Sequence, residues 1–191
     1  MKINREAASK IETCFRVLKV TQYSLLRNGT YLATHSHFGP TIVKFAHSVA
    51  AKQQLKTEAE FLHHHSSPYW PKYLDYGSDM GMDWLMLEFF ESLSIDYSQL
   101  DHSLKKEITS NAEQALIALH GTGYIHGDIK PSNLVYDEEN NQVQLIDWGS
   151  SVWAQLDVHS QPTANNVLDL MSGDLQHTNA RMGDVYFIGP D

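Results

Sequence analysis

IHGDIKPSNLVYDEENNQVQLIDWGSS, residues 125–151, combines two short runs typical of β-strands, NLVYD and QVQLIDW, with the polar turn DEENN between them. Four side chains capable of chemistry flank these runs: Asp128, Lys130, Asn133 and Asp147. Each of them alone fits an ordinary role, such as a turn cap, a solvated lysine or an Asx turn. Together, in loops that strands and a proline hold rigid, they predict a catalytic site beside a strand pair.

The sequence before this stretch predicts strands, turns and one helix. QYSLLRNGTYLATHS carries the hairpin signal Asn28–Gly29, and Gly39–Pro40 marks a second turn before the apolar strand TIVKFAH. VAAKQQLKTEAEFLHHH is rich in helix formers and ends before two prolines. KYLDYGSDMG and DWLMLEFFES have the length and composition of two further strands. We therefore expect a strand-rich front half with a single helix.

A long helix is predicted between this front half and the quoted stretch. SLKKEITSNAEQALIALHGTG, residues 103–123, places leucine, isoleucine and alanine at helical spacing and ends with Gly121 and Gly123. The sequence thus changes from strands to helix, and we expect two parts, residues 1–92 and residues 93–191.

Composition limits the kind of partner that the chain can have. Its 191 residues, 42% of them hydrophobic, can bury a core in one domain or in two small lobes. Asp and Glu number 23 against 14 Lys and Arg, and the net charge of −9 disfavours non-specific binding to nucleic acid or anionic membranes. The sequence has no apolar run of membrane-spanning length and no signal-peptide pattern at its start. Cys14 is the single cysteine, which excludes an internal disulfide, and we expect a cytoplasmic protein.

HGDIKPSN and the later DWG resemble the catalytic loop His-Arg-Asp-x-Lys-Pro-x-x-Asn and the Asp-Phe-Gly motif of the protein kinase family. The resemblance implies a two-lobed, kinase-like α+β fold. Residues 1–92 would form the N-lobe, an antiparallel nucleotide-covering sheet with one helix, and residues 93–191 an incomplete helical C-lobe. The resemblance also implies ATP and Mg²⁺ as cofactors, because the family transfers a phosphoryl group from ATP.

This resemblance implies a role for each of the four side chains named first. Asp128 would orient the attacking hydroxyl and accept its proton, and Lys130 would offset the charge that develops on the transferred phosphoryl group. Asn133 and Asp147 would supply the oxygen ligands that Mg²⁺ prefers. His126 resembles the family's structural histidine, which braces the catalytic loop through backbone contacts.

Residues upstream match the family in the expected order. Lys44 in TIVKFA resembles the lysine of Val-Ala-Ile-Lys, which contacts the α- and β-phosphates. Glu58 is its expected helix partner, with Glu60 as the alternative, because residues two apart on a helix point in different directions. LMLEFFES resembles the hinge, with the backbones of Glu88 and Phe90 as the edge that binds adenine.

The sequence departs from the family pattern in three places. RNGTYLAT has one glycine where the family has Gly-x-Gly-x-x-Gly, so only Gly29 is expected to bind nucleotide, with a plain hairpin as the alternative. Gly127 replaces the arginine that docks a phosphorylated activation loop, and activation by that route is not expected. Trp148 replaces phenylalanine and keeps a large apolar ring.

The final residues, GDVYFIGPD at 183–191, resemble the family's Gly-Thr-x-x-Tyr-x-Ala-Pro-Glu segment, with Pro190 and Asp191 in place of Pro-Glu. The family continues past this segment with further helices. We therefore expect either a fragment of a longer kinase or a kinase that depends on a partner.

Lys130–Pro131 favours transfer to Ser or Thr hydroxyls of a protein. The expected partners are ATP and a protein substrate or activating protein, without nucleic acid or membrane. One alternative is a small-molecule phosphotransferase of the sugar or antibiotic type, whose loops use His-Gly-Asp but usually lack Lys-Pro. Another is a pseudokinase that binds a partner. The single-glycine loop favours a pseudokinase, whereas the intact set of Lys44, Asp128, Asn133 and Asp147 argues against it.

Overall fold

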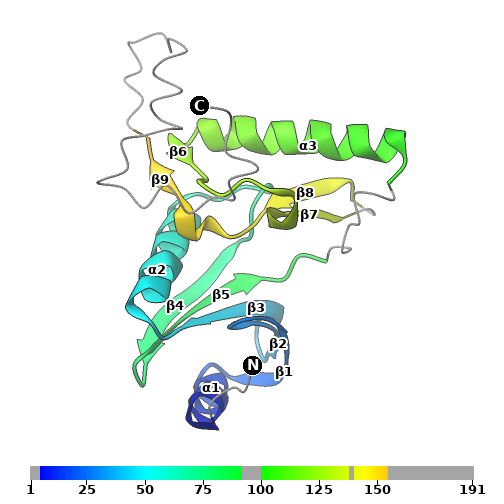
Figure 1. Cartoon of the computed structure of the whole chain (residues 1–191). Helices are drawn as coiled ribbons and strands as arrows, with labels where there is room; N and C mark the ends of the chain where they lie inside the picture. Colours follow the sequence, from blue (N-terminus) through cyan, green and yellow to red (C-terminus); the bar gives the residue numbers. More distant parts are fainter. Residues whose placement is uncertain (1–4, 92–99, 138–139, 155–191) are drawn as a thin grey trace.

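The computed structural model describes residues 5–91, 100–137 and 140–154, and its first half is built on one antiparallel sheet (Figure 1). The strand order is β1-β2-β3-β5-β4. The strands are β1 (Val20–Arg27), β2 (Thr30–His35), β3 (Gly39–Ala46), β4 (Tyr73–Asp79) and β5 (Met82–Glu88). The predicted antiparallel sheet is therefore confirmed, and it contains the four strand regions that the sequence indicated.

Asn28 and Gly29 form the turn between β1 and β2, as the sequence predicts. Gly29 has a φ of +69°, and a Cβ atom there would lie 2.8 Å from the backbone oxygen of Phe45 in β3. A side chain at this position would thus meet both backbone strain and a steric clash. The turn needs glycine because it lies directly against the neighbouring strand.

The second turn is displaced from its predicted position. Gly39 is already the first residue of β3, and the turn occupies residues 36–38. His35 provides the reason, because its Nδ1 accepts hydrogen bonds from the backbone N–H groups of His37, at 3.1 Å, and Phe38, at 3.0 Å. The imidazole therefore closes the turn before the Gly-Pro pair is reached.

A first helix, α1 (Arg5–Val17), was not predicted from the sequence. Phe15 and Leu18 are buried against Tyr31, Val43 and Met86 on one face of the sheet. The second helix, α2 (Val49–His64), packs on the opposite face. That face carries the side chain of Ile42, which precedes Val43 in β3. The two helices thus cover opposite faces of the sheet.

The described part of the second half consists of one long helix and short strands. Helix α3 (His102–His120) begins at Asp101, whose carboxylate accepts the backbone N–H of Leu104 at 2.8 Å, and it buries Ile108, Ala115 and Leu119. The remaining elements are β6 (Tyr124–Ile125), η1 (Pro131–Asn133), β7 (Leu134–Asp137), β8 (Gln142–Leu145), η2 (Trp148–Ser150) and β9 (Val152–Trp153). β6 pairs with β9, and β7 pairs with β8, both antiparallel. The predicted α+β fold of kinase type is confirmed.

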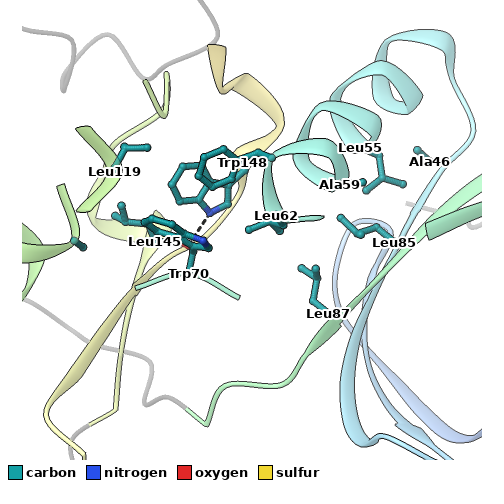
Figure 2. Packing of buried hydrophobic residues seen from close by; sticks show 12 residues of the cluster. Ala46, Leu55, Ala59, Leu62, Trp70, Leu85, Leu87, Leu119, Leu145 and Trp148 are labelled. Atoms are coloured by element: carbon teal, nitrogen blue, oxygen red, sulfur yellow. Dashed lines mark hydrogen bonds between the residues drawn. The ribbon is translucent and has the colours of Figure 1, made fainter. Parts of the chain in front are cut away.

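One hydrophobic core joins the two halves, and its centre is Trp148 (Figure 2). This side chain is fully buried and stacks on Phe61 of α2, with ring centroids 4.0 Å apart and planes 10° apart. Its Nε1–H donates to the backbone oxygen of Leu145 at 2.9 Å. The core therefore fixes the segment after β8 against helix α2. The predicted boundary between residues 92 and 93 lies in the segment 92–99, outside the described residues.

No helix in the described ranges is long and apolar enough to cross a membrane.

Candidate active site

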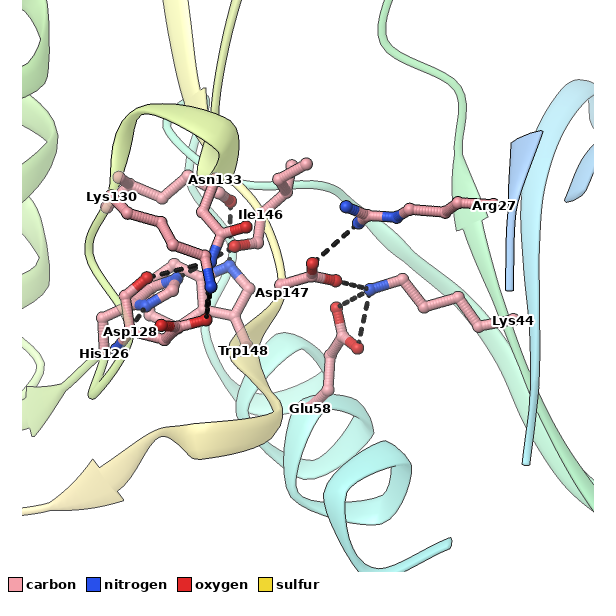
Figure 3. Close-up of polar contacts among 11 residues, drawn as sticks. Arg27, Lys44, Glu58, His126, Asp128, Lys130, Asn133, Ile146, Asp147 and Trp148 are labelled. Carbon is pink, nitrogen blue, oxygen red and sulfur yellow. Dashed lines mark hydrogen bonds and ion pairs between the residues drawn. The ribbon is translucent and has the colours of Figure 1, made fainter. Parts of the chain in front are cut away.

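Lys44 projects from β3 toward α2 and joins three separate parts of the chain (Figure 3). Its Nζ lies 2.7 Å and 2.9 Å from the two carboxylate oxygens of Glu58 and 2.6 Å from Oδ1 of Asp147. Burial alone would lower the pKa of this ammonium, but the two carboxylates raise the pKa above its ordinary value. Lys44 is therefore a charged group held in place by β3, α2 and the segment after β8.

Glu58, and not Glu60, contacts this lysine. Glu58 is 4% exposed on the sheet-facing side of α2. Glu60 lies on the exposed side and pairs with Lys56 at 3.6 Å. The rotation of the helix about its axis, set by the packing of Phe61 and Leu62, decides between the two carboxylates.

Asp147 has a left-handed backbone conformation, with φ of 67° and ψ of 64°. This conformation is uncommon for a residue with a side chain, and here it occurs between Ile146, which follows β8, and the buried Trp148. Burial alone would raise the pKa of the carboxyl, but Lys44 and then Arg27 lower the pKa below its usual range. Asp147 is therefore ionised at neutral pH.

Arg27, at the end of β1, is a member of the site that the sequence reasoning missed. Its Nη2 lies 2.7 Å from Oδ2 of Asp147, while Lys44 occupies Oδ1 of the same carboxylate. Nothing in the local sequence RNGT distinguishes this arginine from a solvated one.

His126 braces the loop that carries Asp128. The imidazole is 1% exposed, its Nε2 donates to the backbone oxygen of Ile146 at 3.1 Å, and its Nδ1 accepts from the backbone N–H of Asp128 at 3.3 Å. Burial lowers the pKa of His126 to about 4. The ring is therefore neutral at physiological pH, in the tautomer that these two hydrogen bonds require.

Gly127 has a backbone conformation that explains the missing arginine. Its φ is +78°, and a Cβ atom there would clash with the backbone oxygen of Ser150. Any side chain at this position would force the loop away from η2. The departure from the family pattern is therefore a requirement of this chain's packing.

Two of the three remaining side chains of the quoted stretch contact the carboxylate of the third, Asp128. Asn133 is 2% exposed, and its Nδ2 donates to the backbone oxygen and to Oδ2 of Asp128, both at 2.9 Å. Lys130 places its Nζ 3.0 Å from the same Oδ2. Because the amide nitrogen of Asn133 faces Asp128, its amide oxygen lies on the other branch of the planar group. Asn133 and Asp147 thus offer an amide oxygen and a carboxylate, donor types that suit Mg²⁺.

A cavity of about 300 Å³ lies between the β1–β2 turn, β3, α2 and the two loops. Lys44, Glu58, Asp128 and Asp147 line it together with the turn residues 28–30. The structure therefore brings the front-half lysine and glutamate to the same cavity as the two aspartates. Gly29, predicted to bind nucleotide, is one of the lining turn residues.

Glu88 and Phe90, predicted to bind adenine, do not line this cavity. The backbone N–H of Glu88 donates to the oxygen of Lys72 at 2.9 Å. Their role stays a prediction. The predicted Pro190–Asp191 segment lies outside the described residues.

Comparison with known proteins agrees with this geometry. A sequence model of the protein kinase domain matches residues 29–175. A probable serine/threonine-protein kinase of Clostridium perfringens is 24% identical over 153 residues, covering 78% of this chain and 20% of that protein. A serine/threonine-protein kinase of Saccharomyces cerevisiae is 36% identical over 87 residues, covering 45% of this chain and 13% of its own length.

A third relative, a probable casein kinase II subunit alpha homolog of Encephalitozoon cuniculi, is 38% identical over 69 residues, covering 34% of this chain and 21% of that protein. The chain thus spans about a fifth or less of the length of these relatives. The kinase-domain match covers more than half of the chain and includes every residue of the cavity except Asn28. This chain belongs to the protein kinase family.

Proposed function

We propose that the chain binds ATP with Mg²⁺ and transfers the γ-phosphoryl group to a Ser or Thr hydroxyl of a protein. The observation that carries the proposal is the convergence, on one cavity, of the Lys44–Glu58 pair, Asp147 and Asp128. These groups come from positions far apart in the sequence. An accidental match to a short motif would not assemble them.

The fit to magnesium and phosphate follows from the donors at the cavity. Mg²⁺ binds carboxylate and amide oxygens, and Asp147 and Asn133 would hold it here. When bound, the ion would neutralise negative charge on the phosphates. Lys44 would bind phosphate oxygens, because Glu58 holds its ammonium at the cavity wall and keeps it charged.

Asp128 would act on the acceptor hydroxyl. Its carboxylate lies at the cavity wall, where it would orient the hydroxyl and take its proton as the bond to phosphorus forms. Lys130, 3.0 Å away, would offset the negative charge on the transferred group. The Lys130–Pro131 pair and the serine/threonine-kinase names of two relatives support a protein hydroxyl as the acceptor.

A second candidate function is a partner-binding module that holds nucleotide without turnover. The observation that favours it is the tight β1–β2 turn. Only two residues, one of them glycine, lie between the paired Arg27 and Thr30. A cytoplasmic location, a protein partner and the absence of nucleic-acid and membrane binding remain predictions under either function.

The test is transfer of label from γ-labelled ATP with Mg²⁺ to three acceptors: the chain itself, a basic protein and a sugar alcohol. Wild type is compared with Asp147→Asn, and Asp79→Asn, at the exposed last residue of β4, is the matched control. We expect wild type and the control to label the protein acceptor, and Asp147→Asn to lose the label. Labelling of the sugar alcohol alone would support a small-molecule phosphotransferase. Nucleotide binding without any transfer would support the partner-binding module.

A further inference from the structure

The turn between β1 and β2 leaves no loop to cover a triphosphate. Arg27 pairs with Thr30, so only Asn28 and Gly29 lie between the strands. The backbone oxygen of Gly29 accepts the N–H of Phe45 at 2.7 Å, which ties the turn to β3. A turn of this kind presents few backbone N–H groups to an anion. A site that binds nucleotide therefore needs another source of positive charge on this side.

An irregularity in β1 directs Arg27 to the cavity side of the sheet. Leu25 pairs with Tyr31, but Arg27 pairs with Thr30, so β1 has one extra residue at this point. Tyr31 belongs to the face covered by α1, whereas Thr30 pairs with Lys44 and shares its face. Regular alternation would have placed Arg27 on the α1 face, and the extra residue turns it to the face of Lys44.

The guanidinium of Arg27 contacts Asp147, a carboxylate that lines the cavity. Its Nη2 is 2.7 Å from Asp147, and its side chain is 45% exposed. Within the described residues, Asp147 is the one carboxylate that pairs with it, whereas Lys44 has Glu58 as a second partner. A guanidinium carries five N–H donors in a planar fork that matches phosphate oxygens. If Asp147 binds a metal ion, Arg27 loses Asp147 as its ion-pair partner, whereas Lys44 keeps Glu58.

We propose that Arg27 is a phosphate-binding residue for the nucleotide, whose guanidinium exchanges Asp147 for phosphate oxygens when Mg²⁺ binds that carboxylate. It takes over the anion-binding task for which the tight turn provides too few backbone amides. The inference rests on the proposed function, since it requires that the cavity bind a nucleotide with Mg²⁺. No bond is made or broken by this residue, and its effect is on affinity and positioning.

The test is calorimetric titration of the full chain with ATP, ADP and adenosine in the presence of Mg²⁺. Arg27→Gln removes the charge, and Arg27→Lys keeps it without the planar fork. Arg16→Gln, at an exposed position of α1, is the matched control. We expect Arg27→Gln to weaken ATP binding about tenfold, the usual effect of one charge-assisted hydrogen bond. Adenosine affinity stays at the wild-type value, Arg27→Lys recovers part of the loss, and Arg16→Gln matches wild type.

The outcomes separate this inference from the function on which it rests. Unchanged ATP affinity in Arg27→Gln overturns the role of Arg27 and leaves the proposed function standing. An equal loss of ATP and adenosine affinity also overturns it, because a structural effect does not distinguish the two ligands. If wild type binds none of the three ligands, both proposals are wrong. Equal thermal unfolding midpoints for wild type and Arg27→Gln check that the variant is folded.

Discussion

Replacing His126 by phenylalanine tests whether a buried neutral imidazole sets the stability of this chain at acid pH. The ring is 1% exposed and packs 4.5 Å from the ring of Trp148. Its Nδ1 already accepts the backbone N–H of Asp128. A proton on Nδ1 would place two N–H groups against each other in a dry environment. The folded chain therefore resists protonation of His126, whereas the unfolded chain does not.

The size of the effect follows from the pKa of His126, which burial lowers from the ordinary value of 6.5 to about 4. Between these two pH values the unfolded chain binds the proton and the folded chain does not. The free energy of unfolding therefore falls as the pH falls from 6.5 to 4. With about 1.4 kcal/mol for each unit of pKa difference, His126 accounts for a loss on the order of 3 kcal/mol.

The assay is urea unfolding at several pH values between 7 and 4, with wild type, His126→Phe and His102→Asn. His102 is exposed at the start of α3 and serves as the control. His126→Phe keeps a ring beside Trp148 but removes the hydrogen bonds of His126 to two backbone groups, so it is less stable at pH 7 by about 1–3 kcal/mol. Its stability then declines less steeply with falling pH than that of wild type. Parallel curves for wild type and His126→Phe would refute the reasoning.

Three further predictions concern packing and charge. Gly127→Ala lowers the free energy of unfolding by at least about 2 kcal/mol, because it combines a positive φ with a Cβ contact to Ser150; unchanged urea unfolding would contradict this. Trp148→Phe lowers the free energy of unfolding by about 1–3 kcal/mol, because it removes the hydrogen bond to Leu145 and leaves a cavity. Urea unfolding measures this change as well. Glu58→Gln removes one of the two carboxylates that contact the buried Lys44. We expect the free energy of unfolding to fall by about 1–3 kcal/mol and ATP binding to weaken in a titration. Wild-type values for both would be inconsistent with the ion pair.

Local signals in the sequence predict the elements that surround the site. The Asn28–Gly29 turn and the residues at helical spacing in α3 are found where the sequence places them, because turn chemistry and hydrophobic periodicity act over a few residues. The β7–β8 pair likewise follows from two apolar runs separated by a polar turn. Helix α1 is an instructive miss, since Ile11 and Phe15 already have helical spacing in a stretch without strong start and stop signals.

The features that sequence reasoning does not supply depend on contacts between distant segments. The sequence favours Glu58 but leaves Glu60 open as the alternative, and the packing of α2 on the core selects Glu58. Arg27 reaches the site because β1 contains one extra residue relative to β2, and no local pattern announces that register change. The need for glycine at position 127 likewise comes from Ser150, on a different element.

The measurement that tests the central claim most directly is the rate of γ-phosphoryl transfer by wild type and Asp128→Asn at saturating ATP and Mg²⁺. The asparagine keeps the shape of the side chain and removes the base, so we expect kcat to fall at least about a hundredfold. ATP affinity, measured by titration, stays within about twofold of the wild-type value, because the role of Asp128 is at the acceptor hydroxyl. Equal transfer rates for the two proteins, or no transfer by wild type, would contradict the account.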